Sequence, residues 1–247
     1  MSAETSEHQT ALITGAGSGM GRAIAKTLAD LGMRVALIGR DRAKLERVRD
    51  EIAEAGGSAL VEPCDVSDRP AVALMAERVL SELGSIDVLV CNAGINTPDR
   101  GLDVLDPAEW DRLIATNLTG AFNLVHVALP SMRERKHGLV IQIASVAGMR
   151  ASVLGGSAYS ASKFGQAALG ICLGREQRTH GIKSTVIYPG EVETPILDAR
   201  PVPVSAERRA LILQPEDVAA AVRFLATLPP RAHVPELVMT PAVDDWV

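Results

Sequence analysis

The chain has 247 residues, of which 47% are hydrophobic and 22% are charged, and its formal net charge is -5. This length and composition fit one large α/β domain over residues 1–247, and the interspersed charges exclude the basic tract expected of a nucleic-acid-binding protein. Residues 1–9 are polar, and no uninterrupted apolar run approaches the ~20 residues of a membrane helix, so we expect a cytoplasmic protein without a membrane partner.

The cysteines and histidines argue against a metal centre or a disulfide framework. Cys64, Cys91 and Cys172 form no C-x-x-C pair and are odd in number, which suits reduced and mostly buried thiols. The five histidines show no metal-ligand spacing. We therefore expect no metal.

Strand and helix patterns alternate along the whole chain. Apolar runs predict strands at residues 10–14, 34–38, 58–63, 86–91, 138–144, 183–188 and 236–239. Amphipathic patterns predict helices at residues 22–31, 43–55, from about 69, 107–135, from the region of 159 to about 179, and 215–228. Residues 196–214 look irregular. This alternation predicts an α/β fold with a doubly wound, Rossmann-like parallel sheet and helices on both faces.

A glycine loop, GAGSGMG at residues 15–21, separates the first strand from the first helix. Its spacing is G-x-x-x-G-x-G, and not the G-x-G-x-x-G of the standard dinucleotide fingerprint. Glycines allow the backbone to approach a pyrophosphate, and a helix N-terminus offers unpaired N–H groups to an anion. We therefore favour nucleotide binding over a simple tight turn.

The end of the second strand favours NADP over NAD. In NAD-binding folds an acidic residue at this point binds the ribose hydroxyls, whereas an arginine accommodates a 2′-phosphate. Here Gly39 and Arg40 occupy the position, and Arg40 can offer a planar set of donors to the phosphate. The alternative is a solvated charge at a helix start, and the adjacent Asp41 supports that alternative.

Two further strand ends carry candidate binding residues. Asp65 follows the third strand, where it could accept a hydrogen bond from an adenine amino group or cap the helix that begins near Arg69. Asn92, Ala93 and Gly94 follow the fourth strand. We expect Asn92 to bridge neighbouring strands and the two small residues to keep the floor of the site thin.

Tyr159 and Lys163 are candidates for acid–base chemistry. If the stretch is helical, both side chains project from one face, about one turn apart. The ordinary phenol pKa of ~10 is too high for this work at neutral pH, and a nearby ammonium group would lower it. The pair could then exchange a proton with a carbonyl or an alcohol. The alternative is a solvent-facing pair on an ordinary helix.

The motifs occur in the order seen in the short-chain dehydrogenases/reductases, which the chain resembles from residue 10 to about 240. They are Thr14-Gly15-x-x-x-Gly19-x-Gly21, Asn92-Ala93-Gly94, Asn117, Ser145, Tyr159-x-x-x-Lys163 and Pro189-Gly190. The resemblance implies an NADP(H)-dependent enzyme that interconverts a ketone or aldehyde and its alcohol. The rival interpretations are an NAD-dependent alcohol dehydrogenase working oxidatively and a non-catalytic nucleotide-sensing protein on the same fold.

The resemblance also implies residue roles. Tyr159 would be the general acid or base, and Lys163 would lower its pKa and bind the nicotinamide ribose. Ser145 would donate a hydrogen bond to the substrate oxygen, and Asn117 would hold a water that links Lys163 to solvent. The implied cofactor-binding residues are Gly15, Ser18, Gly19, Met20, Gly21, Arg40, Asp65, Val66, Asn92, Ala93, Gly94, Tyr159, Lys163, Pro189, Gly190, Val192 and Thr194.

Three features depart from the family pattern. Ser18 stands where many NADP-using members carry a basic residue. The interval from Ser145 to Tyr159 is one residue longer than is common, which leaves Ser157 as an alternative to Ser145. The C-terminal tail lacks the usual Asp-Gly-Gly, and its Trp246 could pack on a partner subunit or over the active site, or be unanchored.

The substrate pocket should form from residues 95–102, 146–157 and 191–213. Glu191 could reach it and favour a hydroxyl- or amine-bearing substrate, or be an ordinary loop carboxylate. An apolar wall is expected from Met149, Val153 and Leu154. Three arginines could receive a carboxylate or be solvated: Arg200, Arg208 and Arg209. By the family resemblance we also expect a homodimer or homotetramer, formed through helices at residues 110–129 and 159–178.

Overall fold

The computed structural model describes residues 9–244. Its centre is a seven-stranded parallel sheet in the order β3-β2-β1-β4-β5-β6-β7. The strands are β1 (Thr10–Thr14), β2 (Arg34–Gly39), β3 (Ser58–Pro63), β4 (Val88–Cys91), β5 (Gly138–Ile143), β6 (Ile182–Pro189) and β7 (Glu236–Met239). The predicted doubly wound parallel sheet is thus confirmed.

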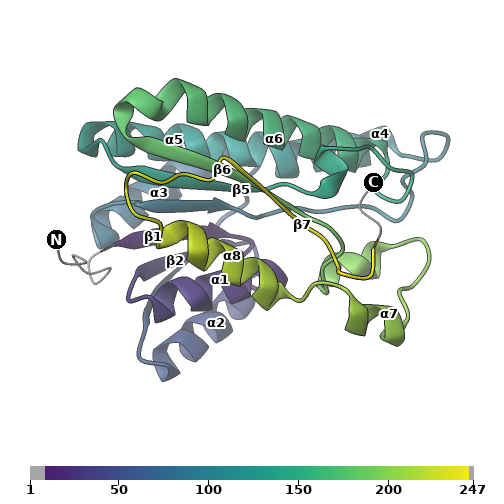
Figure 1. The fold of residues 1–247 in the computed structure, drawn as a ribbon, viewed down its shortest axis with the longest axis horizontal. Coiled ribbons are helices and arrows are strands. Elements are labelled where there is room, and N and C mark those ends of the chain that lie inside the picture. Colours follow the sequence, from purple (N-terminus) through teal and green to yellow (C-terminus); the bar gives the residue numbers. More distant parts are fainter. Residues whose placement is uncertain (1–8, 245–247) are drawn as a thin grey trace.

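Helices cover both faces of the sheet (Figure 1). They are α1 (Gly19–Asp30), α2 (Arg42–Glu54), α3 (Arg69–Leu83), α4 (Pro107–Ile114), α5 (Gly120–Arg135), α6 (Ser157–Gln177), α7 (Ala206–Leu211) and α8 (Pro215–Ala226). One apolar core joins α1, α2 and α8 to one face of the sheet, and a second core joins α3, α5 and α6 to the other face.

Neighbouring residues of a strand belong to different cores, because successive side chains point to opposite faces. In β1, Ile13 packs under α1 and α2, whereas Leu12 packs under α3 and α5. Both side chains are fully buried. Burial on both faces explains why the strands read as continuous apolar runs rather than as alternating ones.

The long helix expected over residues 107–135 is present but is interrupted by a π-helical turn at Ala115–Thr119. By length and composition alone, Pro107–Arg135 is long and apolar enough to cross a membrane. Its inward face, which includes Leu124, Val125 and Ala128, nevertheless lies in the core against β4 and β5. The apolar character therefore serves the packing of the fold.

One element was missed by the sequence analysis. Residues 196–214 were expected to be irregular, but they contain the short helix α7. Ser205 caps it by accepting a hydrogen bond from the backbone N–H of Arg208 at 3.2 Å. The two nearby prolines suggested an irregular segment, although Ser205 is an ordinary serine N-cap.

The crevice for a ligand lies where the strand order reverses. β1 pairs with β2 on one side and β4 on the other, so the loops after β1 and β4 diverge at their carboxyl ends. These loops pack very closely. A Cβ on Gly21 would press on the carbonyl oxygen of Gly15 and lie 2.6 Å from Nδ2 of Asn92. Only glycine fits at residue 21.

We therefore expect Gly21→Ala to lower the free energy of unfolding by ~1–3 kcal/mol through overpacking, measured by denaturant titration. Gly174→Ala in α6 is the matched control, because its added Cβ would meet only an ordinary contact at 3.4 Å. That variant should gain ~0.5–1 kcal/mol from the higher helix propensity of alanine. Equal stability of the Gly21→Ala and native chains would contradict this account of the loop.

Candidate active site

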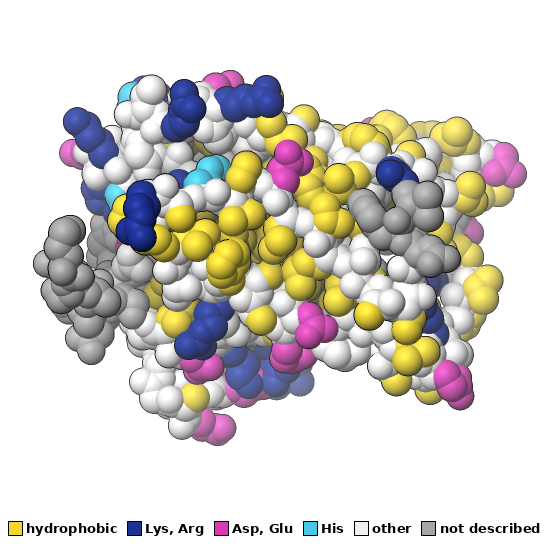
Figure 2. Space-filling model, in the orientation of Figure 1, with side chains coloured by type: hydrophobic (Ala, Val, Ile, Leu, Met, Phe, Trp, Pro, Cys, Tyr) yellow, Lys and Arg dark blue, Asp and Glu magenta, His cyan; other side chains and the backbone are white. Residues whose placement is uncertain are grey.

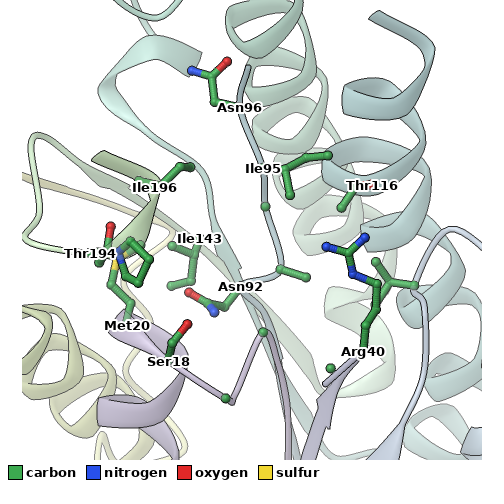
Figure 3. A pocket seen from close by; sticks show the side chains of 18 of the residues that line it. Ser18, Met20, Arg40, Asn92, Ile95, Asn96, Thr116, Ile143, Thr194 and Ile196 are labelled. Atoms are coloured by element: carbon green, nitrogen blue, oxygen red, sulfur yellow. The ribbon is translucent and has the colours of Figure 1, made fainter. Parts of the chain in front are cut away.

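A cavity of about 830 Å³ opens at the carboxyl ends of β1, β2, β3 and β4. Arg40 lies at one side of it, and Met20, Thr194 and Ile196 lie opposite, with Ser18 and Asn92 between them (Figure 3). The predicted cofactor residues that line it are Gly15, Ser18, Gly19, Met20, Arg40, Asp65, Val66, Asn92, Ala93, Gly94, Tyr159, Lys163 and Thr194. Residues at or after the ends of six strands, β1 to β6, thus line one cavity.

Four predicted cofactor residues do not line this cavity. Gly21 lies behind Gly15 and Asn92, and Pro189 is the last residue of β6. Gly190 lines a second cavity. Val192 is buried in the core and forms an isolated bridge with Leu213. These four residues lie outside the lining of the large cavity.

The loop after β1 is tied to the loop after β4 through Thr14 and Asn92. Thr14 Oγ1 accepts hydrogen bonds from the backbone N–H groups of Asn92 and Ala93, both at 3.0 Å. Asn92 Nδ2 donates to the Thr14 carbonyl at 2.8 Å. The expected bridge between strands is present. The other side-chain atom, Asn92 Oδ1, is buried without a partner in the described residues.

The helix that follows the glycine loop presents its N-terminus to the cavity. Ser18 is the N-cap residue of α1, and its side chain forms no capping hydrogen bond. Gly15 and Gly19 have φ angles of +65° and +49°, a region that glycine adopts without strain. The first N–H groups of the helix are therefore left to bind an anion.

Arg40 extends from the end of β2 into the cavity (Figure 3) and forms no ion pair with the described residues. The adjacent Asp41 is engaged elsewhere: it caps α2 by accepting from the backbone N–H of Lys44 at 3.1 Å. This hydrogen bond is the main reason that the pKa of Asp41 is lowered. Asp41 is thus engaged with Lys44, and no ion pair joins it to Arg40 in the described residues.

Asp65 does not cap the next helix, so that alternative was wrong. The cap of α3 is Asp68, which accepts from the backbone N–H of Ala71 at 3.0 Å. Asp65 instead accepts from the backbone N–H and hydroxyl of Ser67, at 2.9 and 2.7 Å. Burial raises the pKa of Asp65, but the Ser67 hydrogen bonds and the nearby Arg40 charge lower it overall. Asp65 is thus an ionised acceptor in the cavity wall.

Tyr159 lies in the first turn of α6 and lines both the large cavity and a second cavity of about 500 Å³. Ser145, at the end of β5, lines the second cavity together with Tyr159, and its hydroxyl lowers the pKa of Tyr159. Ser157 lines neither cavity, and its hydroxyl is buried. The geometry therefore favours Ser145 over Ser157 as the serine beside Tyr159.

The electrostatics of the Tyr159–Lys163 pair differ from expectation. Burial raises the pKa of Tyr159, and the groups that lower it are Ser145 and Arg100, not Lys163. Burial also lowers the pKa of Lys163 to about 7. The reason is that loss of water disfavours the charged form of both groups. Lys163 Nζ lies 5.8 Å from the centre of the Tyr159 ring.

Lys163 is held by neutral partners. Its Nζ donates to the carbonyl of Ile143 and to Oε1 of Gln166, both at 2.8 Å. Gln166 is held in turn through hydrogen bonds to the carbonyl of Cys91 and to Gln142. The ammonium group thus has a fixed position and no carboxylate partner among the described residues.

Asn117 lies fully buried in the π-helical turn, a type of distortion often found at functional sites. Its Oδ1 accepts from the backbone N–H of Ile95 at 2.8 Å. Its Nδ2 donates to the Ile95 carbonyl and to the Ser162 hydroxyl, both at 3.0 Å. Asn117 fixes the loop after β4, and its role in holding a water stays a prediction.

The second cavity is more polar than expected. Of the predicted apolar wall, Leu154 lines it, whereas Met149 and Val153 do not, and Val153 is 96% exposed. The loop turns these two side chains outward. The charged residues that line the cavity are Arg100, Glu191, Arg200, Arg208 and Asp244.

Glu191 does reach the pocket, but ion pairs occupy it. It lies 2.5 Å from Arg200 and 2.5 Å from Arg208, and Arg208 lies 2.6 Å from Asp244. Arg209 pairs with Glu193 and Asp198, at 2.6 and 2.8 Å. The three arginines are therefore held in ion pairs, and Arg208 and Arg209 remain partly exposed.

Arg100, which no sequence motif indicated, is the remaining charge in the second cavity. It is 9% exposed and donates to the carbonyls of Thr97, Leu154 and Ala199 at 2.9, 2.7 and 2.6 Å. The only signal in the sequence was its place in a loop that follows a central strand.

Two further expectations concern metals and the tail. Residues 9–244 contain no group of three or more His, Cys, Asp or Glu side chains that could hold a metal ion. Cys64 and Cys91 are buried, but Cys172 is exposed. Trp246 lies outside the described residues.

The lowered pKa of Lys163 predicts a pH-dependent stability. Between pH 7 and the ordinary lysine value of 10.5, the unfolded chain binds a proton that the folded chain lacks, so native stability should rise with pH by up to ~1.4 kcal/mol per unit. We expect Lys163→Met to remove this rise in stability. Any pH dependence that comes from other groups should stay the same in both chains. Denaturant unfolding of both chains from pH 6 to 10 measures it, and parallel profiles would contradict the assignment.

Comparison with known proteins agrees with this geometry. A family model described as short chain dehydrogenase matches residues 9–202. A cis-4-hydroxycyclohexanecarboxylate dehydrogenase from Sinomonas cyclohexanicum is 35% identical, covering 91% of each chain. A 3-oxoacyl-(acyl-carrier-protein) reductase from Staphylococcus aureus is 36% identical over 89% of this chain and 91% of that one.

Solved structures give the same result. A metagenomic short-chain oxidoreductase in complex with NADP has a TM-score of 0.84 and 37% identity, covering 98% of this chain and 100% of that one. An actinorhodin polyketide ketoreductase with NADPH has a TM-score of 0.88 and 32% identity, covering 98% and 99%. The chain therefore belongs to the short-chain dehydrogenase family.

Proposed function

We propose that this protein is an NADP(H)-dependent oxidoreductase that interconverts a ketone or aldehyde and its alcohol by hydride transfer. The observation that carries the proposal is the position of Tyr159, which lines both cavities. A cofactor in the larger cavity and a substrate in the smaller one would meet beside its hydroxyl. The family relationship supports the same class of chemistry.

The larger cavity suits a dinucleotide. The free N-terminus of α1 provides donors for a pyrophosphate, and the closely packed glycine loop allows the backbone to approach it. Two structural relatives are described as complexes with NADP or NADPH. A 3-ketoacyl-(acyl-carrier-protein) reductase from Brucella melitensis, 29% identical, is described as a complex with NADH. In this chain, the choice between NADP and NAD therefore depends on Gly39 and Arg40.

In reduction, one hydride and one proton are added across the carbonyl bond. The cofactor, when bound, supplies the hydride. Tyr159 gives its hydroxyl proton to the carbonyl oxygen, and the Ser145 hydroxyl donates a hydrogen bond to the same oxygen as charge develops there. In oxidation, Tyr159 takes the proton from the alcohol.

Lys163 is suited to proton transfer because its pKa of about 7 populates both protonation states near neutral pH. It lies one helical turn from Tyr159 and contacts the same cavity. We infer that Lys163 returns a proton to Tyr159 and contacts the ribose of the cofactor. Asn117 supports this arrangement by fixing the loop at Ile95.

Substitution of the proton donor tests the mechanism. We expect Tyr159→Phe to lower kcat by ~10²–10⁴-fold, the usual contribution of a general acid, in a spectrophotometric screen of carbonyl compounds with NADPH. Cofactor binding, followed by fluorescence, should be nearly unchanged. Turnover within a few-fold of the native enzyme would refute the assigned role.

Cofactor choice can be tested at Arg40. We expect Arg40→Ala to weaken NADPH binding by roughly 10- to 100-fold, as is usual for charge-assisted hydrogen bonds, and to leave NADH binding nearly unchanged. Arg42→Ala is the matched control, because Arg42 is exposed, pairs with Glu46 at 3.6 Å and does not line the cavity. An equal loss for both cofactors would count against NADP specificity and favour the NAD-dependent alternative.

We also infer that the protein forms a homo-oligomer. Exposed aromatic residues lie on the predicted interface helices: Trp110 on α4, Phe122 on α5 and Phe164 on α6. Figure 2 shows further hydrophobic side chains over the edge strand β7, whereas charged side chains gather over α1 and α2. Exposed apolar surface of this kind is typical of subunit interfaces.

A further inference from the structure

We propose that Arg100 binds the carboxylate of the substrate in the second cavity, so that the enzyme acts on hydroxy acids and keto acids. This inference rests on the proposed oxidoreductase function and adds the class of substrate. It rests on three observations: the burial of Arg100, the lack of a counter-charge for it among the described residues, and its place in the cavity that Tyr159 also lines.

Arg100 is positioned by three loops. Its donors bind the carbonyls of Thr97, Leu154 and Ala199, which belong to the loops after β4, β5 and β6. Gly156 is pressed against it, since a Cβ there would lie 2.6 Å from Cβ of Arg100. These bonds use one N–H on each nitrogen, and a guanidinium has more. Donors therefore remain for a ligand in the cavity that Arg100 lines.

The charges of the cavity balance except at Arg100. Glu191 and Asp244 form a closed network of ion pairs with Arg200 and Arg208, so two negative charges meet two positive ones. Arg100 forms no ion pair with any residue in the range 9–244. The second cavity therefore carries one positive charge that the described protein does not neutralise.

A buried cation without a counter-charge is unfavourable, and burial together with the Arg200 charge lowers the pKa of Arg100. Neutral carbonyls satisfy hydrogen bonds but leave the charge uncompensated. A carboxylate would both accept the remaining N–H groups and neutralise the charge, and hydrogen bonds between two ionised groups are the strong ones.

The same charge acts on the proton donor. Arg100 and Tyr159 line the same cavity, and the positive charge of Arg100 lowers the pKa of Tyr159. A substrate with its carbonyl at Tyr159 and its carboxylate at Arg100 must be compact, because the cavity measures about 500 Å³. A purely structural latch would need the three carbonyl contacts but would show no preference for charged substrates.

The experiment compares matched acids and esters. The probes are 4-oxocyclohexanecarboxylate and 4-oxopentanoate, each with its methyl ester, reduced with NADPH by the native enzyme, Arg100→Gln and Arg100→Lys. We expect the native kcat/KM to favour each acid by roughly 10- to 100-fold, the usual range for a charge-assisted hydrogen bond. Arg100→Gln should lose this preference for the acid, and Arg100→Lys should retain part of it.

The ratio of acid to ester isolates the charge. A change in the pKa of Tyr159 or a loosened loop would lower kcat/KM for acid and ester alike and would leave the ratio unchanged. An unchanged ratio in Arg100→Gln would therefore assign Arg100 a positioning role only. A native ratio near one would overturn the proposal even if that variant did not fold.

A binding measurement separates this inference from the proposed function. The native chain is titrated calorimetrically, with NADP present, with cyclohexanecarboxylate and with its neutral analogue cyclohexanecarboxamide. Neither compound has a ketone that the enzyme could reduce. We expect tighter binding of the acid, and loss of that difference in Arg100→Gln. If this holds while the keto acids are not turned over, the catalytic proposal fails and the carboxylate site stands. Equal binding of both compounds to the native chain would refute the site.

Discussion

The structure depends on the divergence of the chain on either side of β1. Because β1 pairs with both β2 and β4, the loops at their carboxyl ends separate and leave a crevice that no side chain fills. Hydrogen bonds between Thr14 and Asn92 hold the two loops in register. Gly21 permits the close approach that these bonds require. Without this junction, neither the cavity nor the position of α1 would be defined.

Burial controls the chemistry placed on this framework. The phenol of Tyr159 and the ammonium of Lys163 both lose water, and each is driven toward its neutral form. Their pKa values consequently move apart, because that of Tyr159 rises from its ordinary value and that of Lys163 falls to about 7. This arrangement differs from one in which a permanently charged lysine lowers the pKa of the tyrosine. With a pKa of about 7, Lys163 is only partly charged at neutral pH, and Arg100 is the cation that lowers the pKa of Tyr159.

The second cavity shows how neighbouring arginines can have different roles. Arg200 and Arg208 are neutralised by Glu191 and Asp244 and so stabilise the loops that cover the cavity. Arg100 is satisfied only by carbonyl oxygens. Charge balance, and not the number of basic residues, therefore distinguishes Arg100 from the other arginines of this cavity. These groups come from three strand ends. Arg100 follows β4, Arg200 and Arg208 follow β6 with Glu191, and Asp244 follows β7.

The sequence alone determined the order of strands and helices, the glycine loop, and the residues at strand ends that line the crevice. These features could be predicted because each depends on residues that are close together in the chain. The sequence missed α7, whose single serine cap lay between prolines. Only the tertiary structure decided which charges pair, that Ser145 lies beside Tyr159, and that Arg100 stands without a counter-charge. Those outcomes depend on desolvation and on contacts between residues far apart in the chain, which no local pattern encodes.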